Sequence, residues 1–306
     1  MTDIATQPAR ASGEFEIGGD LRVVRLGYGS MQLPGPGVWG PPRDHDEAIR
    51  VLRRAVELGV TFIDTADSYG PDVAEPIIRE ALYPYSRDLV IATKVGLTRS
   101  GPGLWGRNGN PEYLKAEAEK SLRLLGLERI ELFQLHRIDP RVPLEDQLGA
   151  LVELQGDGKI RHIGLSEVSV TEIHAARAIT AIATVQNLYN VSDRGAEPVL
   201  EYCERASIGF IPWFPMATGR LARADGPLQR IAGEHGVTPA QLALAWLLRR
   251  SPVLLPIPGT SSVAHLEENV NAALIELTSE QIEQLNEMIW SRPKQPGRRP
   301  EQGERV

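Results

Sequence analysis

The stretch Val60-Thr61-Phe62-Ile63-Asp64-Thr65-Ala66-Asp67-Ser68-Tyr69-Gly70 indicates how this chain folds. Its β-branched and aromatic start is typical of a short buried strand, which turns polar at Asp64. An acid and a phenol, Asp64 and Tyr69, therefore leave the carboxyl end of one predicted strand together. Such groups need a reason to be there, because the interior of a sheet protein disfavours unpaired polar side chains.

Two later strand-like runs also end in a titratable side chain, at Lys94 and at His136. Each residue alone has a structural explanation, since an acid can cap a helix and a lysine can reach solvent from a strand end. In a barrel of parallel strands, however, the carboxyl ends converge on one face, where catalytic residues from different strands meet. We therefore predict that Asp64, Tyr69, Lys94 and His136 form one catalytic site.

The four residue types suit the reduction of a carbonyl group. An ammonium at Lys94 would stabilise the phenolate of Tyr69 and lower the phenol's pKa from about 10, so that it can donate a proton near neutral pH. Asp64 would keep Lys94 charged and in place. His136 would hydrogen-bond to the carbonyl oxygen and orient it.

Strand-like and helix-like patterns alternate along the chain. Repeated strand-then-helix units predict a parallel sheet, and about eight units favour a closed α/β barrel, the (β/α)8 TIM barrel, over an open doubly wound sheet. A β-hairpin is expected before the barrel, around residues 18–20. The predicted strands are 24–30, 61–64, 89–94, 130–136, 160–165, 183–188, 209–213 and 253–257, and the predicted helices are 46–58, 74–82, 112–125, 144–156, 171–179, 196–206, 238–249 and 263–273.

Length and composition fit one domain. The chain has 306 residues and 42% hydrophobic composition, enough for a single barrel. We assign the barrel to residues 16–290. Residues 1–15 and the Pro- and Arg-rich tail at 291–306 are expected to be disordered.

Charge and cysteine content exclude several classes of protein. A formal net charge of −7, without a long basic run before the tail, argues against a nucleic-acid partner. The single cysteine, Cys203, excludes an internal disulfide and suits a reducing compartment. No secretion signal or membrane-spanning run is found. We expect a cytoplasmic monomer or weak homo-oligomer that acts on a small molecule and has no metal site.

Two glycine-rich stretches, 35–40 and 101–106, match the G-x-G-x-x-G dinucleotide pattern. That pattern binds a pyrophosphate only where it forms a tight turn from strand to helix. Here a proline follows the first glycine, a tryptophan precedes the last, and neither stretch opens a helix. We interpret both as flexible strand-end loops whose Trp39 and Trp105 wall a substrate pocket. Simple packing of each tryptophan against the barrel is an equal alternative.

The order and spacing of the motifs resemble the aldo-keto reductase superfamily over roughly residues 20–290. The resemblance implies an NAD(P)H-dependent oxidoreductase that acts on carbonyl or CH–OH groups. Within the superfamily, residues 26–33, 35–43 and 78–85 look like the bacterial branch that includes NADPH-dependent pyridoxal reductases. The superfamily motifs are residues 62–66 with 69–70, 92–94, 135–136, 163–166, 185–190 and 257–260.

The resemblance also implies the position of the nicotinamide. Trp213 would stack on the ring, and Ser166 and Gln186 would hydrogen-bond its carboxamide. Glu167 replaces the usual Asn, and a carboxylate cannot donate to the carboxamide oxygen, so Ser166 or Gln186 must do so. The residues implied along the pyrophosphate are Phe214, Pro215, Met216, Gly219 and Leu221.

At the adenosine end, the resemblance implies contacts around the start of the helix at 263–273. Thr260 and Ser261 would bind phosphate oxygens there, and Glu268 with Asn269 would contact adenine. Gly259 and His265 stand where many relatives carry Lys and Arg for the 2′-phosphate. We still expect NADPH, because the branch implies it, with NADH as the alternative.

These observations predict the NADPH-dependent reduction of an aldehyde or ketone, with the hydride from the nicotinamide and the proton from Tyr69. Pyridoxal, reduced to pyridoxine, is the first substrate expected. Sugar-derived or other small carbonyl compounds fit the same residues. A cofactor-sensing regulatory subunit is an alternative of another class, since this fold also serves in channel-associated proteins, but the intact set of four residues argues against it.

Overall fold

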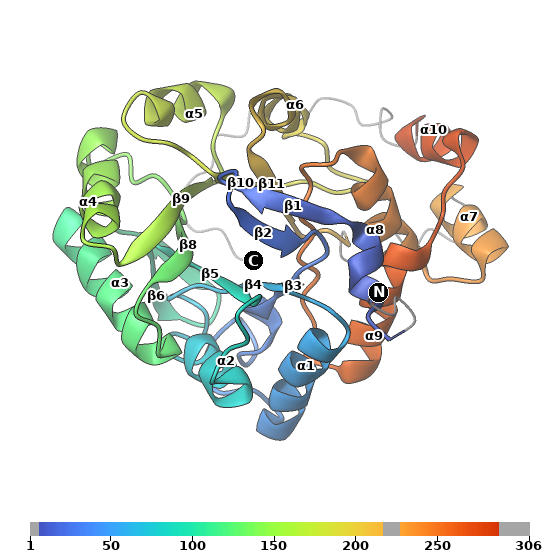
Figure 1. Ribbon diagram of the computed structural model, residues 1–306, viewed down its shortest axis with the longest axis horizontal. Coiled ribbons are helices and arrows are strands. Elements are labelled where there is room, and N and C mark those ends of the chain that lie inside the picture. The colour runs from blue at the N-terminus through green and yellow to red at the C-terminus, as the bar shows by residue number, and fades with distance from the viewer. Residues whose placement is uncertain (1–5, 217–226, 288–306) are drawn as a thin grey trace.

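The computed structural model describes residues 6–216 and 227–287, and its centre is a curved parallel sheet (Figure 1). Seven strands lie in the order β11-β10-β9-β8-β5-β4-β3, and every pairing is parallel. This arrangement is the (β/α)8 barrel that the sequence predicts. The strands are β3 (Tyr28–Gly29), β4 (Phe62–Asp64), β5 (Val90–Val95), β8 (Ile130–Leu135), β9 (Ile160–Ser166), β10 (Thr184–Leu188) and β11 (Gly209–Trp213).

The segment at residues 253–258 closes the ring between β11 and β3 without forming a regular strand. Phe210 donates to the carbonyl of Val253 and accepts from Leu255, both at 2.8 Å. On the other side, Gly27 donates to the carbonyl of Pro256 at 2.9 Å. The prediction of a strand at 253–257 is therefore wrong in detail, because prolines at 252, 256 and 258 lack the N–H groups that a continuous ladder needs.

Helices surround the sheet (Figure 1) and confirm the predicted strand-then-helix alternation. Asp44 caps the first of them by accepting from the backbone N–H of Glu47, and Asn110 caps the third. The sequence analysis missed α7 and α10. The helices are α1 (His45–Glu57), α2 (Ala74–Leu82), α3 (Pro111–Leu125), α4 (Leu144–Gly156), α5 (Val170–Arg177), α6 (Glu197–Ala206), α7 (Pro227–His235), α8 (Pro239–Arg250), α9 (Val263–Asn271) and α10 (Ser279–Glu287), with 3₁₀ turns at Pro8–Ser12, Ser30–Gln32 and Ala272–Leu274.

The predicted N-terminal hairpin is present as β1 (Glu14–Ile17) and β2 (Leu21–Val24), an antiparallel pair in which Ile17 faces Leu21. Its apolar side chains pack with the residues that fill the barrel interior, among them Phe62 and Leu132. The expectation of disorder over residues 1–15 is wrong for residues 8–15, because Ala9 is fully buried and its N–H donates to the carbonyl of Leu58 at 3.1 Å. Residues 1–5 and the tail at 291–306 lie outside the described residues.

A second hairpin follows β5. It consists of β6 (Leu97–Gly101) and β7 (Leu104–Arg107), which pair antiparallel with Arg99 opposite Trp105. The interpretation of residues 101–106 as a flexible loop is therefore wrong: most of that stretch belongs to a paired hairpin. The hairpin stands on the carboxyl-terminal side of β5, the same side as Tyr69.

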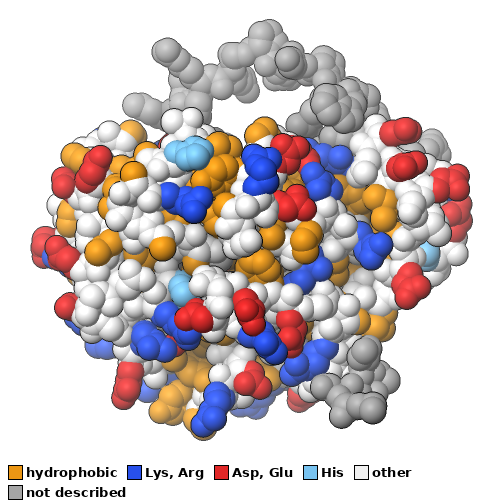
Figure 2. Space-filling model, turned by 45° about the horizontal axis from the view of Figure 1, so that its top comes forward, with side chains coloured by type: hydrophobic (Ala, Val, Ile, Leu, Met, Phe, Trp, Pro, Cys, Tyr) orange, Lys and Arg blue, Asp and Glu red, His pale blue; other side chains and the backbone are white. Residues whose placement is uncertain are grey.

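The surface carries charges of both signs. Figure 2 shows Lys and Arg side chains interspersed with Asp and Glu side chains on the face that it draws. Over residues 6–216 and 227–287, none of the helices combines the length and the apolar composition that crossing a bilayer requires.

Candidate active site

A buried lysine links an acid and a phenol at the carboxyl ends of β4 and β5. The Nζ of Lys94 donates to Asp64 Oδ2 at 2.5 Å, to the carbonyl oxygen of Thr65 at 2.8 Å and to the hydroxyl oxygen of Tyr69 at 3.2 Å. Lys94 is 0% exposed, Asp64 1% and Tyr69 6%. All three N–H bonds of the ammonium therefore have an acceptor, as a buried charge requires.

Backbone hydrogen bonds place the acid and the phenol. Asp64 lies opposite Ala92 in the parallel register of β4 and β5. Beyond the end of β4, Thr65 N donates to the carbonyl of Ala92 at 2.8 Å and Asp67 N to that of Lys94 at 3.2 Å. The loop that carries Tyr69 therefore continues the sheet pairing for several residues and holds the phenol over Lys94.

Burial raises the pKa of Tyr69 above its usual value, and the opposing effect of Lys94 does not offset it. The prediction that this pKa falls is therefore wrong for this structure, because loss of solvation of the phenolate outweighs the ammonium. Burial lowers the pKa of Lys94, but Asp64 and Tyr69 together raise it overall. The lysine is thus charged and the phenol protonated at neutral pH, the state that a proton donor needs.

His136 follows β8 and joins the same group. Its ring lies edge-on to the ring of Tyr69, with centroids 6.0 Å apart, and its Nδ1 is 3.4 Å from Ser68 Oγ. Burial, with the positive charges of Lys94 and Arg137, lowers its pKa well below the usual range. A neutral imidazole has one N–H to donate to an acceptor such as a carbonyl oxygen. The structure therefore brings all four predicted catalytic residues together.

Two glutamine side chains support Asp64. Gln134 Nε2 and Gln186 Nε2 donate to its Oδ1 at 3.1 and 2.9 Å. Gln186 was predicted only as a ligand of the nicotinamide carboxamide, and its hydrogen bond to Asp64 was not foreseen. Gln134 was missed, although it lies two residues before His136 and so on the same side of the strand.

The residues expected near the nicotinamide lie at the carboxyl ends of β9, β10 and β11. Arg137 Nη1 donates to Ser166 Oγ at 2.9 Å, which leaves the serine O–H as a donor. Glu167 has a φ of 55°, and its Oε1 accepts from the indole Nε1 of Trp213 at 2.6 Å and from Leu188 N at 2.7 Å. Glu167 therefore orients the Trp213 side chain through this hydrogen bond. The sequence analysis did not foresee this contact.

The segment after Trp213 is described only in part. Phe214 has a φ of 52°, its ring centroid lies 5.0 Å from that of Trp213, and its carbonyl accepts from Asn190 Nδ2 at 3.1 Å. Pro215 is buried and Met216 half-buried. Gly219 and Leu221, which were predicted to line the pyrophosphate, lie outside the described residues.

The predicted adenosine end lies before and along α9. Thr260 is buried, with its Oγ1 accepting from Ser262 N at 3.1 Å, whereas Ser261, His265 and Glu268 are exposed and Asn269 is buried. A carboxylate already lies at the helix start, since Glu47 Oε1 accepts from Val263 N at 3.0 Å. This oxygen is close to where the sequence analysis expected phosphate.

The absence of a cation at Gly259 has a steric reason. A Cβ at this position would lie 2.8 Å from the carbonyl oxygen of Gly29, closer than a carbon atom can approach without movement of the backbone. Any side chain here, lysine included, would displace β3. The missing cationic side chain is therefore a consequence of close packing between this loop and β3.

Both tryptophans of the glycine-rich stretches lie near Tyr69. Trp105 packs, with Met31 and Val38, against the small apolar cluster that contains Tyr69. Trp39 forms a bridge with Gly70, and the next residue, Gly40, donates to the carbonyl of Gly70 at 2.8 Å. The structure thus places the backbone of Trp39 next to Gly70 and the side chain of Trp105 against the cluster of Tyr69, an arrangement compatible with a pocket wall and with simple packing against the barrel.

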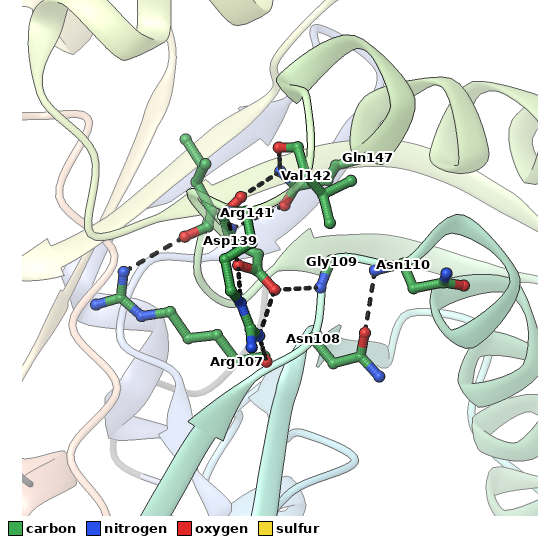
Figure 3. Close-up of polar contacts among 9 residues, drawn as sticks. Arg107, Asn108, Gly109, Asn110, Asp139, Arg141, Val142 and Gln147 are labelled. Carbon is green, nitrogen blue, oxygen red and sulfur yellow. Dashed lines mark hydrogen bonds and ion pairs between the residues drawn. The ribbon is translucent and has the colours of Figure 1, made fainter. Parts of the chain in front are cut away.

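A polar network centred on Asp139 connects the loop after His136 to the base of the β6–β7 hairpin (Figure 3). The carboxylate of Asp139 accepts from Gly109 N at 3.1 Å and from Arg141 Nη2 at 2.8 Å, and Arg141 also donates to the carbonyl of Arg107. Gln147 of α4 donates to the carbonyl of Asp139 at 3.0 Å. The bonds from Arg141 hold the pKa of Asp139 far below its usual value.

The sequence pattern of the aldo/keto reductase family matches residues 25–289. The chain belongs to this family. It is therefore an oxidoreductase.

Relatives of this aldo/keto reductase have similar length. It is 50% identical over 279 residues to an uncharacterized oxidoreductase of Schizosaccharomyces pombe, covering 91% of this chain and 90% of the relative. It is 45% identical over 282 residues to pyridoxine 4-dehydrogenase of Escherichia coli, covering 90% and 98%. A crystal structure of an aldo-keto reductase from Klebsiella pneumoniae in complex with NADPH superposes with a TM-score of 0.78 at 28% identity, covering 93% and 97% of the two chains.

Proposed function

We propose that this aldo/keto reductase reduces an aldehyde or ketone to the alcohol with NADPH, and that pyridoxal, reduced to pyridoxine, is its substrate. The substrate is suggested by the Escherichia coli pyridoxine 4-dehydrogenase, which this chain covers over 98% of its length at 45% identity. The cofactor is suggested by the Klebsiella pneumoniae structure with NADPH. Sugar-derived and other small carbonyl compounds, and NADH as the reductant, are the alternatives.

The proposal rests above all on the ammonium of Lys94, which is buried between the carboxylate of Asp64 and the phenol of Tyr69. The cofactor, when bound, supplies a hydride to the carbonyl carbon. Tyr69 donates its proton to the carbonyl oxygen, and Lys94 stabilises the phenolate that remains. The neutral imidazole of His136 donates a hydrogen bond that orients the same oxygen.

Asp64 acts through Lys94. Its Oδ2 holds the ammonium, while Gln134 and Gln186 satisfy its Oδ1. An uncompensated lysine in this position would have a low pKa because of burial, and it would then lose the charge that stabilises the phenolate. Asp64, supported by its two glutamines, therefore keeps Lys94 charged beside the phenol of Tyr69.

The side chains at the ends of β9 and β11 suit a nicotinamide better than those near α9 suit a 2′-phosphate. Trp213 offers a half-buried aromatic face, and Ser166 offers a hydroxyl donor because its oxygen already accepts from Arg137. Near α9, by contrast, Gly259 leaves no room for a cation and Glu47 places a carboxylate at the helix start. We therefore propose only a modest preference for NADPH over NADH.

The test is NADPH oxidation, followed by absorbance, with pyridoxal and a panel of other aldehydes and ketones. Tyr69→Phe removes one oxygen atom and should lower kcat by about 10²–10⁴, while NADPH affinity stays close to that of the wild type. Tyr202→Phe, on the outer helix α6, is the matched control and should leave both quantities unchanged. Wild-type turnover in Tyr69→Phe would contradict the role of the phenol, and a wild-type protein that reduces no carbonyl compound would contradict the proposed function.

A further inference from the structure

Three chain segments around Tyr69 meet at one guanidinium group, that of Arg99 on β6. All five of its N–H bonds point to backbone carbonyl oxygens. Nη1 donates to Val38 O at 2.7 Å and to Ser68 O at 2.9 Å. Nη2 donates to Gly37 O at 2.7 Å and to Gly101 O at 3.3 Å. Nε donates to Leu104 O at 3.2 Å. A guanidinium has five donors and no acceptor. Arg99 therefore has no donor left for a substrate anion. Its role is to connect the three backbone segments whose carbonyl oxygens it binds.

The same guanidinium lies against both tryptophans of the glycine-rich stretches. Its Cζ is 3.7 Å from the ring centroid of Trp105 and 5.7 Å from that of Trp39. Arginine stacks well on aromatic rings, because its planar cation is attracted to the π face and is weakly hydrated. One side chain thus contacts two indole rings, one from the loop at residues 35–40 and one from β7.

The loop at residues 35–40 needs such support. Gly37 has a φ of 71° and Val38 a φ of 54°, and the left-handed region is unfavourable for a β-branched residue. Arg99 binds the carbonyl oxygens of both residues. A further bond joins the two glycine-rich stretches directly, since Gly103 N donates to the carbonyl of Gly37 at 3.0 Å.

This assembly stands next to the phenol. Arg99 binds the carbonyl of Ser68, the residue before Tyr69, while Trp105 packs in the apolar cluster that contains Tyr69. Burial lowers the pKa of the Arg99 guanidinium, and the phenol of Tyr69 acts in the opposite direction. The two indole rings therefore have a fixed place relative to the proton that the substrate is to receive.

We propose that Arg99 is a positioning residue that fixes Trp39 and Trp105 as one wall of the substrate pocket and so selects carbonyl compounds with a flat ring. The inference rests on the proposed carbonyl reduction. A rigid aromatic wall stabilises a planar ring by stacking, whereas a short aliphatic aldehyde gains little from it. In this role Arg99 touches neither the cofactor nor the reacting atoms.

The test compares Arg99→Met and Arg99→Lys with Arg107→Met, a control on the same hairpin whose exposed guanidinium makes one long bond, 3.4 Å to the carbonyl of Ile138. KM and kcat are measured for pyridoxal and for propanal. Arg99→Met should raise KM for pyridoxal about tenfold or more, with kcat, KM for propanal and NADPH affinity close to those of the wild type. Arg99→Lys keeps the charge but not the planar fork, and it should give a smaller change in the same direction.

A second readout does not require turnover. The five tryptophans give separate indole N–H signals in a ¹⁵N-correlation spectrum, and Trp39→Phe and Trp105→Phe assign two of them. Arg99→Met should move those two signals and leave the other three in place.

Unchanged indole signals with an unchanged KM for pyridoxal would overturn the proposal. So would a variant in which kcat, NADPH affinity and both KM values all deteriorate, since Arg99 would then support the fold in general. If the wild type reduces no carbonyl compound, the proposed function fails, and the indole signals alone decide whether Arg99 fixes the wall.

Discussion

Glu75 of α2 should make this protein less stable as the pH rises toward neutrality. Its side chain is 2% exposed, and Thr93 Oγ1 donates to its Oε1 at 2.7 Å. Burial raises the pKa of this carboxyl from 4.5 to about 7, with Asp72 adding to the effect and Lys120 opposing it. The group therefore stays protonated in the folded chain over a range in which it ionises in the unfolded chain.

The size of the effect follows from the difference between these two pKa values. Each pKa unit corresponds to about 1.4 kcal/mol, so a rise from 4.5 to about 7 corresponds to at most about 3 to 4 kcal/mol. Because the folded pKa is the higher one, this stability is fully present below about pH 4.5 and is lost as the pH rises to about 7. Above that range the contribution no longer changes.

Glu75→Gln isolates this contribution. The glutamine keeps an oxygen that can accept from Thr93 but cannot ionise. Relative to the wild type, the variant should gain up to about 3 kcal/mol in free energy of unfolding between about pH 5 and pH 8. The gain includes any relief at Asp67, whose pKa is raised well above its usual value by burial and by the nearby Glu75.

The measurement is denaturant unfolding followed by circular dichroism at several pH values between about 5 and 8. Glu128→Gln, which changes an exposed glutamate on the loop after α3, is the control and should follow the wild type at every pH. If the difference between Glu75→Gln and the wild type is the same at every pH, Glu75 does not titrate in this range and the reasoning from burial is wrong.

Three other predictions concern the site. Lys94→Met should lower kcat by about 10² or more, because the phenolate left at Tyr69 loses its stabilising charge; near-wild-type kcat would show a structural role. Glu167→Ala should weaken NADPH binding severalfold in a fluorescence titration and have a smaller effect in a Trp213→Phe background, where the indole N–H is already absent and only the bond from Leu188 N is lost; equal effects in both backgrounds would contradict the anchoring role. His265→Arg should raise the NADPH/NADH ratio of kcat/KM about tenfold, and an unchanged ratio would place the 2′-phosphate elsewhere.

The sequence was sufficient for the barrel because strand and helix patterns repeat with regular spacing. It also predicted that four side chains lie together, because parallel strands present their carboxyl ends on one face. These are Asp64, Tyr69, Lys94 and His136. Gln134 shares a side of its strand with His136, but nothing in the sequence marks its bond to Asp64, and no pattern marks Arg99. Their roles depend on hydrogen bonds to residues distant in the chain, which the spacing of neighbouring residues does not reveal.

The errors have separate physical causes. The hairpin of β6 and β7 was taken for a loop because its glycines and prolines conceal the pairing of Arg99 with Trp105. The N-terminal turn was taken for disorder because its polar composition hides the buried Ala9. The pKa of Tyr69 was predicted from its charged neighbour alone, whereas desolvation is a property of the folded surroundings.

The proline-rich segment at residues 253–258 completes the barrel without a regular strand ladder. Between β11 and β3 the wall depends on scattered bonds such as those of Phe210 and Gly27, where the other strands are joined by regular ladders. Amide exchange should therefore be fastest along this side of the barrel wall. Trp213 lies at the carboxyl end of β11, on one side of this segment, and Thr260 follows the segment closely, so a dinucleotide that contacts both would connect β11 to the segment that completes the barrel.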